Sequence, residues 1–506
     1  MPNSDVLTVS CVLRGHECRN EVQVVAQVFF PGARFSFGED ICANGFCVES
    51  FFDGGAAWAV IYKNGAEITR EKFADGGESF LNSRRILMLA IYHALQRAVG
   101  AHTPWGALTG IRPSKLVREW MGDGCGDDDI LARLANPFCV SDEKARLAVA
   151  TAHAEQRVEA RISGSVGLYI SVPFCPSRCI YCSFNTADKP ADADFLARYV
   201  SAIIDEIREK VIYLRESGLR ISSIYIGGGT PTFLPNALLE KMLFAARENF
   251  AEFLMLDAEF TVEAGRPDTL TPTNLQILRR YGVNRIAVNP QTLNDAALAA
   301  IGRSHTAADF FRAFALARDA GFDCINTDLI AGLPGETDGD MRRNMDALAP
   351  LAPENITIHT LAIKRASHLK ARQACIGRRG HLVVGDITSR SRIAFDACEQ
   401  IGAKNFGKNS VEAALSVAAE SCAAMGLSPY YLYRQKNMVG LFENVGYALP
   451  GRECLYNVGM MAEVQTILGI GAGAVSKFVR GAKISREFNA KNPEVFVARR
   501  AFAPQK

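Results

Sequence analysis

The chain has 506 residues, and its 56 Lys and Arg residues against 54 Asp and Glu residues leave a formal net charge of +2. Hydrophobic residues make up 48% of the chain and charged residues 22%, as in a globular protein. This composition and the small net charge exclude a disordered chain and a chain that binds nucleic acid through an overall basic surface. No run approaches the ~18 uncharged apolar residues of a membrane span, and residues 1–20 lack the apolar core of a secretory signal, so we expect a soluble, cytoplasmic protein without a membrane span.

The first 160 residues alternate strand-like and helical patches and predict a small α+β module. Residues 58–63 and 66–70 flank Asn64-Gly65, a pair that suits the two positive φ angles of a type I′ turn and predicts a β-hairpin. Residues 84–99 read as an apolar helix that ends at Gly100. Pro113 marks a further helix start, and Lys115 beside it indicates either an anion-binding site or a solvated helix face.

From about residue 165 the chain changes to short β-rich runs separated by helix-length segments. Six such units predict parallel strands with right-handed crossovers, in an open sheet or a partial barrel. In such folds the functional groups collect beyond the carboxyl ends of the strands, so we expect one site at one edge of the sheet. The predicted strands are residues 167–172, 221–226, 258–262, 284–288, 324–330 and 355–361.

Three cysteines follow the first of these strands. Cys175, Cys179 and Cys182 have the spacing C-x3-C-x2-C, which lets three thiolates converge on one soft metal centre. A structural zinc site usually adds a fourth Cys or His, whereas an iron-sulfur cubane can use three cysteines and leave one iron open to another ligand. The missing fourth ligand favours the cubane over zinc. The other eleven of the 14 cysteines, Cys324 and Cys422 among them, are expected to be small core residues in the reduced state.

Polar or glycine residues follow the later strands as well. The run 227–230, Gly-Gly-Gly-Thr, would let a ligand approach the backbone closely, although it could also mark only a tight turn, and it lacks the lysine of a P-loop. Glu263 at the third strand end is either a ligand acceptor or a surface carboxylate. Gln291, Asp328 and His359 come at the next strand ends.

The segment around the cysteines, Tyr-Ile-Ser-Val-Pro-Phe-Cys from residue 169, resembles the signature of radical S-adenosylmethionine enzymes. Over most of residues 165–475 the chain is similar to the oxygen-independent coproporphyrinogen III oxidase (coproporphyrinogen dehydrogenase) family. The resemblance implies a [4Fe-4S] cluster on Cys175, Cys179 and Cys182, with S-adenosylmethionine bound to the free iron as the source of a 5′-deoxyadenosyl radical. It implies an α/β fold with an N-terminal α+β module (1–160), a partial (β/α)6 barrel (161–375) and a mostly helical C-terminal cover (376–506).

The same resemblance implies the residues that bind the cofactor. Arg303, twelve positions after Gln291, would pair with its carboxylate, and Ile330 would line the adenine pocket. Tyr181 is nearly as well explained as a core aromatic. The implied cofactor-binding residues are Tyr169, Tyr181, Gly227, Gly228, Gly229, Thr230, Glu263, Gln291, Arg303, Asp328, Ile330 and Ala362.

Two positions depart from the best-characterised branch of the family. Ser171 stands where that branch has a histidine, and Phe184 stands where it has a further cysteine. The sequence looks closer to the HemZ-type branch, as residues 108–115, 359–367 and 429–436 also indicate.

The implied activity is the oxidative decarboxylation of coproporphyrinogen III propionates to vinyl groups, which gives protoporphyrinogen IX in haem biosynthesis. The alternatives are a haem-binding chaperone and a radical enzyme that acts on another tetrapyrrole. The implied partners are a tetrapyrrole and a reductant such as flavodoxin or ferredoxin, with no nucleic acid.

The C-terminal segment and the histidines complete the sequence predictions. Residues 430–436 carry three tyrosines, Arg434 and Lys436, and they either contact the tetrapyrrole or form a packing segment. Residues 469–474 resemble the family's last glycine-rich element beside the cofactor, or form a structural turn. We assign no catalytic role to His305, His359 or His368.

Overall fold

A computed structural model of the chain describes residues 7–362 and 408–501, apart from residues 54, 75, 77–79, 111, 183–190, 436–437 and 482. It divides into two compact units, Met1–Ala152 and His153–Lys506. The expected boundary at residue 375 lies outside the described residues.

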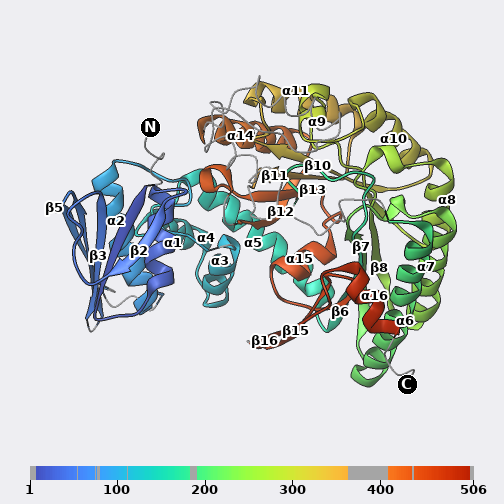
Figure 1. Cartoon of the computed structure of the whole chain (residues 1–506), viewed down its shortest axis with the longest axis horizontal. Coiled ribbons are helices and arrows are strands. Elements are labelled where there is room, and N and C mark those ends of the chain that lie inside the picture. The colour runs from blue at the N-terminus through green and yellow to red at the C-terminus, as the bar shows by residue number, and fades with distance from the viewer. Residues whose placement is uncertain are drawn as a thin grey trace, which may run out of the picture. The chain divides into compact units, whose positions relative to one another are not determined.

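The first unit contains a five-stranded sheet with the order β2-β1-β3-β4-β5 (Figure 1). The predicted hairpin is confirmed, because β4 and β5 pair in antiparallel fashion around Asn64 and Gly65, with φ angles of 54° and 77°. The predicted helix is α2, which ends at Gly100 with a φ of 69°. The elements are β1 (Thr8–Arg14), α1 (Arg19–Phe29), β2 (Arg34–Gly38), β3 (Phe46–Asp53), β4 (Ala56–Lys63), β5 (Ala66–Ala74), α2 (Ser83–Val99), α3 (Pro113–Gly122) and α4 (Asp127–Ala135). The long helix α5 (Asp142–Ile162) begins in this unit and continues into the second.

The second unit is built on one eleven-stranded sheet with the order β12-β13-β11-β10-β9-β8-β7-β6-β14-β15-β16. Strands β6 to β11 are the six predicted strands, and each pairs in parallel with its neighbour. The order of the described strands does not close on itself, so the sheet is a partial barrel. The strands are β6 (Ser165–Val172), β7 (Arg220–Gly228), β8 (Leu254–Glu263), β9 (Arg285–Ala287), β10 (Cys324–Ala331), β11 (Asn355–Thr360), β12 (Ser428–Tyr433), β13 (Asn444–Ala448), β14 (Thr466–Ile470), β15 (Val475–Arg480) and β16 (Lys483–Phe488).

The helices between the parallel strands lie along the outer side of the curved sheet, whereas α15 lies on its inner side (Figure 1). Each crossover places its helix on the same side, as the right-handed rule requires. The helices are α6 (Ala193–Ser217), α7 (Asn236–Phe250), α8 (Pro272–Arg280), α9 (Asp295–Ala300), α10 (Ala307–Asp319), α11 (Asp338–Leu348), α14 (Lys408–Ala424), α15 (Leu455–Met461) and α16 (Pro493–Ala501).

The two faces of the parallel sheet differ in chemistry because alternate side chains of a strand point to opposite faces. In β8, Phe260 and Val262 are buried and apolar, while Glu259, Thr261 and Glu263 alternate with them. The same alternation separates isoleucines from polar residues along β9 and β11. The inner face of the partial barrel is therefore polar, and it is the face available to a ligand.

The C-terminal region differs in part from the expected helical cover. It contributes helices, but its described residues also add five strands to the two edges of the sheet. Strand β14 is parallel to β6, and β13 is antiparallel to β11. Strands β13 and β14 are short and pair with partners about 80 to 300 residues earlier in the sequence, so local patterns in the sequence do not reveal these two pairings.

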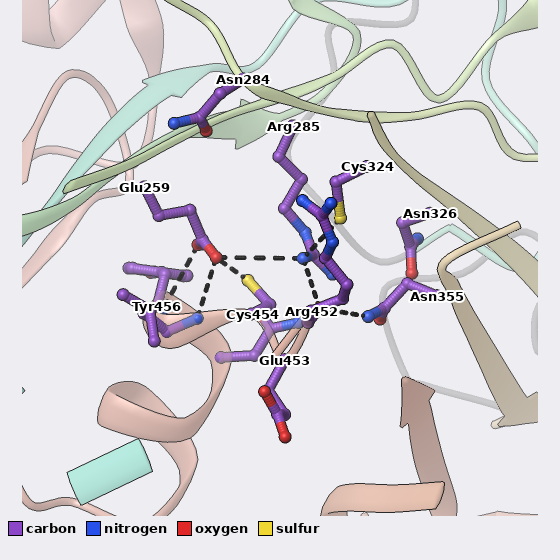
Figure 2. A network of polar contacts seen from close by, with 12 residues as sticks. Glu259, Asn284, Arg285, Cys324, Asn326, Asn355, Arg452, Glu453, Cys454 and Tyr456 are labelled. Atoms are coloured by element: carbon purple, nitrogen blue, oxygen red, sulfur yellow. Dashed lines mark hydrogen bonds and ion pairs between the residues drawn. The ribbon is translucent and has the colours of Figure 1, made fainter. Parts of the chain in front are cut away.

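A buried polar network fixes α15 against the amino ends of the strands (Figure 2). Glu259 accepts hydrogen bonds from the backbone N–H of Leu455 (3.0 Å) and from the thiol of Cys454 (3.1 Å). Arg285 lies 3.9 Å from Glu259 and donates to the backbone O of Arg452 at 2.8 Å. The network therefore ties the loop before α15 to β8 and β9.

Nine of the eleven cysteines expected in the core lie in the described part of the chain, and the expectation is wrong for four of them, which are only half-buried. The buried ones are Cys11, Cys47, Cys324, Cys422 and Cys454, and the half-buried ones are Cys18, Cys42, Cys125 and Cys139. Cys422 is fully buried in α14, as expected of a small core residue. Cys324 is also buried, but its Sγ accepts a hydrogen bond from Arg285 Nη1 at 3.0 Å. It is therefore part of the polar network rather than an ordinary apolar core residue.

Candidate active site

The cysteine loop follows β6 and folds back over the carboxyl edge of the sheet. None of the three cysteines forms a disulfide, and Cys179 is buried while Cys175 and Cys182 are half-buried. The backbone N–H of Thr230, after β7, donates to the backbone O of Phe174 at 2.7 Å, and Cys175 Sγ lies 3.3 Å from Thr230 Oγ1. The loop after β6 and the glycine run after β7 are thus held together.

Arg266 holds the middle of the cysteine loop. Its side chain is only 2% exposed, and its Nη1 donates to the backbone O and to Oγ of Ser177, at 3.2 and 3.0 Å. Asp268 accepts from the Nε of the same guanidinium at 3.1 Å. Because Arg266 comes directly after β8, the cysteine loop is fastened to the third strand of the barrel as well as the second.

The three thiols suit a cluster better than a single metal ion. Burial raises the pKa of Cys175 to about 11 against the effect of the Thr230 hydrogen bond, and Cys179 and Cys182 raise the pKa further. Among the described residues, no three Cys, His, Asp or Glu side chains are arranged to enclose one metal ion. The Cys175 thiol therefore becomes a thiolate only beside a cationic partner, which an iron-sulfur cluster held by the three cysteines would supply.

The glycine run after β7 is required by close packing. A Cβ on Gly227 would lie 2.5 Å from Glu263 Oε2, and a Cβ on Gly229 would lie 2.5 Å from the backbone O of Phe174. Gly228 has a φ of +101°, which other residues rarely adopt. Any side chain at residues 227–229 would push the strand end away from the cysteine loop or from Glu263.

Glu263 lies at the end of β8 and points to the inner face of the barrel. Its Oε1 accepts a hydrogen bond from the Tyr225 hydroxyl at 2.6 Å, and its Oε2 accepts from the backbone N–H of Gly228 at 3.1 Å. Burial raises the pKa of Glu263 to about 7 even though the Tyr225 hydrogen bond lowers it, and the charge of Asp328 raises it further. The carboxyl group can therefore gain or lose its charge near neutral pH.

Asp328, on β10, is held by several donors. Asn289 Nδ2 and Asn326 Nδ2 donate to its two carboxylate oxygens at 2.8 and 2.7 Å, and His359 Nε2 lies 3.5 Å from Oδ2. Burial opposes ionisation, but the hydrogen bond and charge of His359, together with hydrogen bonds from Asn326 and Thr357, outweigh it and lower the pKa of Asp328. The site therefore keeps one carboxylate ionised beside a second that titrates.

Gln291 and Ile330 lie where β10 meets the chain that follows β9. The backbone N–H of Gln291 donates to the backbone O of Asp328 at 3.0 Å, and Ile330 donates back to Gln291 at 2.9 Å. These two bonds continue the pairing of β10 beyond the end of β9. Gln291 has a φ of 70°, which is an unusual backbone conformation for a residue other than glycine. Ile330 packs in an apolar cluster with Ile180 and Leu361, against which Tyr181 is partly buried.

Arg303 is held by two backbone oxygens of the barrel. Its Nη1 and Nη2 donate to the backbone oxygens of Asn289 and Gly265 at 2.7 and 3.1 Å. Its Nε is buried and has no hydrogen-bond partner in the described part of the chain. Burial opposes the charged form, but the nearby Tyr181 and Cys179 outweigh it and raise the pKa of Arg303. A fixed, buried guanidinium with a free N–H is suited to receive an anionic group of a ligand.

Aromatic rings cover the inner face below Glu263. Tyr225 and Tyr456 stack with ring centroids 4.5 Å apart, and Tyr169 stacks on Tyr456 at 5.8 Å. Ser171 lies at the end of the same strand as Tyr169, where its hydroxyl donates to the backbone O of Ala472 at 2.7 Å. The glycine-rich segment after β14 therefore lies beside the site and also forms a structural turn.

The structure brings most of the predicted residues to one edge of the sheet, at the ends of β6 to β10. Ala362 lies just beyond β11, where it forms an isolated bridge with Met438. Tyr430 and Tyr431 are buried, which the packing interpretation of this segment explains. Arg434 is also buried and donates to the backbone O of Leu441 at 2.8 Å. Phe184, His368 and Lys436 lie outside the described residues.

Four residues of the site went unrecognised or unassigned in the sequence. Arg266 binds the cysteine loop at Ser177, and Asn289 donates a hydrogen bond to Asp328. Tyr225 donates a hydrogen bond to Glu263. His359 was noted at a strand end, but its contact with Asp328 depends on the register between β10 and β11. The period of two along β7 could have placed Tyr225 on the same face as Gly227, since the two are two positions apart.

Comparison with known proteins identifies what the chain resembles. The Radical SAM superfamily model matches residues 169–348. The oxygen-independent coproporphyrinogen-III oxidase-like protein HemZ of Bacillus subtilis is 34% identical over 83% of this chain and 79% of its own length. The heme chaperone HemW of Bacillus subtilis is 35% identical over 39% of this chain and 50% of its own length, and HemW of Mycobacterium tuberculosis is 29% identical over 65% and 73%.

Solved structures and membrane topology give two further findings. Coproporphyrinogen III oxidase (HemN) from Escherichia coli, described as a radical SAM enzyme, aligns with a TM-score of 0.47 and 22% identity over 68% of this chain and 70% of that chain. In the described part of the chain, no helix has the length and apolar character needed to cross a membrane.

Proposed function

Since the chain belongs to the radical SAM superfamily, and within it to the family of HemZ-like proteins related to oxygen-independent coproporphyrinogen III oxidase, we propose that it decarboxylates the propionates of coproporphyrinogen III. Members of this superfamily use a [4Fe-4S] cluster and S-adenosylmethionine. Each event would transfer one hydrogen atom from a propionate β-carbon to the 5′-deoxyadenosyl radical, release carbon dioxide and pass one electron to an external one-electron acceptor, which leaves a vinyl group. Two events would give protoporphyrinogen IX.

The observation that carries the proposal is the convergence, at one edge of the sheet, of three free thiols with Glu263, Asp328 and a buried arginine. When bound, the cluster and S-adenosylmethionine would supply a carbon-centred radical able to take a hydrogen atom from an unactivated carbon. Cys175, Cys179 and Cys182 would hold the cluster. The protein's own contribution would be to fix the positions of the reacting groups and to exclude water.

Several residues would bind and orient the cofactor. The free Nε of Arg303 would receive its carboxylate, and the glycine run at 227–229 would let the backbone approach it. Glu263 and Asp328 would accept hydrogen bonds from its hydroxyl and amino groups. Tyr181 and Ile330 would contact apolar parts of the cofactor.

The tyrosines of the inner face would exclude water from the reacting carbon. Tyr169, Tyr225 and Tyr456 present stacked rings beside Glu263. Aromatic surfaces suit the individual pyrrole rings of a porphyrinogen, and the stacking of the tyrosines keeps solvent from between them. We place this reaction in the cytoplasm, with flavodoxin or ferredoxin as the electron donor.

A second candidate is haem binding and delivery, because several relatives are named heme chaperones. The fold and the cluster would be the same in both cases. The two candidates differ in whether decarboxylation occurs.

The experiment is an anaerobic assay with reconstituted protein, a reductant, S-adenosylmethionine and coproporphyrinogen III. We expect 5′-deoxyadenosine and a vinyl product, and we expect both to disappear when Cys175, Cys179 and Cys182 are changed to Ala. Cys125→Ala, at a half-buried cysteine of the first unit, is the matched control and should retain iron and activity. Tight haem binding without decarboxylation would instead favour the chaperone, and a colourless protein with stoichiometric zinc would contradict both.

A further inference from the structure

The second unit has a cavity of about 550 Å³ that the proposed function does not use. It lies between α5, the start of β12, the end of β13 and the loop before α15. Apolar side chains and arginines line it together. The lining residues are Ala154, Arg157, Val158, Arg161, Ser428, Pro429, Tyr430, Ala448, Pro450, Gly451 and Glu453.

The cavity lies at the amino edge of the parallel sheet, away from the cysteine loop. Ala448 pairs with Asn355, the first residue of β11, and Ser428 pairs with Ala448 in turn. Strand β11 then runs six residues to Thr360 at the other edge. At ~3.3 Å per residue this distance is roughly 20 Å, so a ligand here would not touch the candidate active site.

The buried polar network preforms one wall of the cavity. The loop that contributes Pro450, Gly451 and Glu453 also contains Arg452, whose backbone O accepts hydrogen bonds from Arg285 and Asn355, each at 2.8 Å (Figure 2). Tyr430, on the opposite wall, donates to Asn355 Oδ1 at 3.0 Å. Asn355 thus joins both walls, and the cavity does not have to be ordered when a ligand binds.

The charges that line the cavity favour an anion. Arg157 and Arg161 are one helical turn apart on α5 and lie on the same face. Arg161 faces Glu453 at 3.9 Å and Asp257 at 3.7 Å, both too long for a hydrogen-bonded pair. Arg157 is exposed and has no hydrogen bond or ion pair in the described part of the chain. The lining therefore combines one unpaired guanidinium with an apolar floor formed by Val158, Pro429 and Ala448.

We propose that this cavity binds an organic carboxylate with an apolar body, and that Arg157 receives the carboxylate. The planar guanidinium matches a carboxylate in a two-point contact. The apolar residues of α5, β12 and β13 cover the rest of the ligand. The cavity has the size of typical small-molecule sites. The site is independent of the radical chemistry, so it stands or falls separately from the proposed decarboxylation.

The test is calorimetric titration of the full chain with decanoate, below its micelle concentration. We expect saturable binding of one decanoate per chain, and binding about tenfold weaker in Arg157→Gln, since tenfold corresponds to the loss of one charge-assisted contact. Arg157 is exposed, so the substitution should leave the thermal unfolding of the protein unchanged. Decylammonium, with the same apolar body and the opposite charge, should bind at least tenfold more weakly than decanoate.

The matched control is Gln156→Glu. It changes the net charge by the same amount at the neighbouring exposed position, which does not line the cavity. Decanoate should bind this variant as it binds the unaltered protein. The proposal is wrong if decanoate shows no saturable binding, if decylammonium binds equally well, or if the two variants weaken binding to the same extent.

Discussion

Both edges of the parallel sheet bury charged side chains, but the hydrogen-bond partners of these side chains differ between the two edges. At the amino edge, Glu259 accepts hydrogen bonds from the start of α15, and Arg285 donates to Cys324 and to the loop before α15. At the carboxyl edge, Glu263 and Asp328 oppose each other's ionisation, and Arg303 keeps an unused N–H. The difference is that Glu259 and Arg285 are bonded to other parts of the fold, whereas Arg303 leaves its Nε without a hydrogen-bond partner among the described residues.

The largest effect should come from breaking the amino edge. Arg285→Met leaves Glu259 buried without its cation, and we expect the free energy of unfolding of the second unit to fall by about 3–5 kcal/mol. The double variant Glu259→Gln/Arg285→Met should recover part of this loss. Urea unfolding measures both.

The control for this variant is Arg280→Met. Arg280 forms a 2.7 Å ion pair with Glu240 in which both side chains are exposed, so its loss should cost about 0–1 kcal/mol. If the two substitutions cost the same, the amino edge does not support the fold in the way proposed here.

At the carboxyl edge, Gly227→Ala should weaken ligand binding more than it lowers the stability of the fold. Its Cβ would lie 2.5 Å from Glu263 Oε2 and would displace that carboxyl group. We expect S-adenosylmethionine to bind more than about tenfold more weakly, as measured by equilibrium dialysis of the reconstituted protein, because a displaced acceptor loses a charged hydrogen bond. Gly265→Ala, whose Cβ has its nearest neighbour at 3.6 Å, is the control and should bind normally.

The ionisation of Glu263 should make cofactor binding depend on pH. The pKa is raised by burial to about 7 from 4.5, so the stability that the protonated group contributes is complete below pH 4.5 and is lost as the pH rises through 7. Binding that needs the carboxylate should run in the opposite direction and strengthen as the pH rises through 7. In Glu263→Gln this step should vanish, and a step that persists would assign the titration to another group.

The smallest effects should be shifts, in opposite directions, of the pH at which cofactor binding is half-way between its weak and its strong form. Asp328 raises the pKa of Glu263 and His359 lowers it. Asp328→Asn should therefore move the midpoint to lower pH, and His359→Gln should move it to higher pH, with the dialysis measurement repeated across the pH range. Shifts in the same direction would show that the three groups do not interact as the structure indicates.

The sequence by itself determined the elements with local signals. The Asn64-Gly65 hairpin, the helix that ends at Gly100 and the six parallel strands all follow from turn residues and hydrophobic periodicity, which act over a few neighbouring residues. The cysteine spacing and the residues at the strand ends also predicted a single site. Their roles in binding the cluster and the cofactor stay predictions.

Only the tertiary structure decided which distant groups meet. The contact of His359 with Asp328, the anchoring of the cysteine loop by Arg266, and the pairing of β14 with β6 join residues about 30 to 300 positions apart. Strand register and loop closure set these contacts, and neither leaves a local pattern in the sequence. The same reason applies to the cavity at the amino edge, because its lining residues come from α5 and from segments about 270 to 300 residues later.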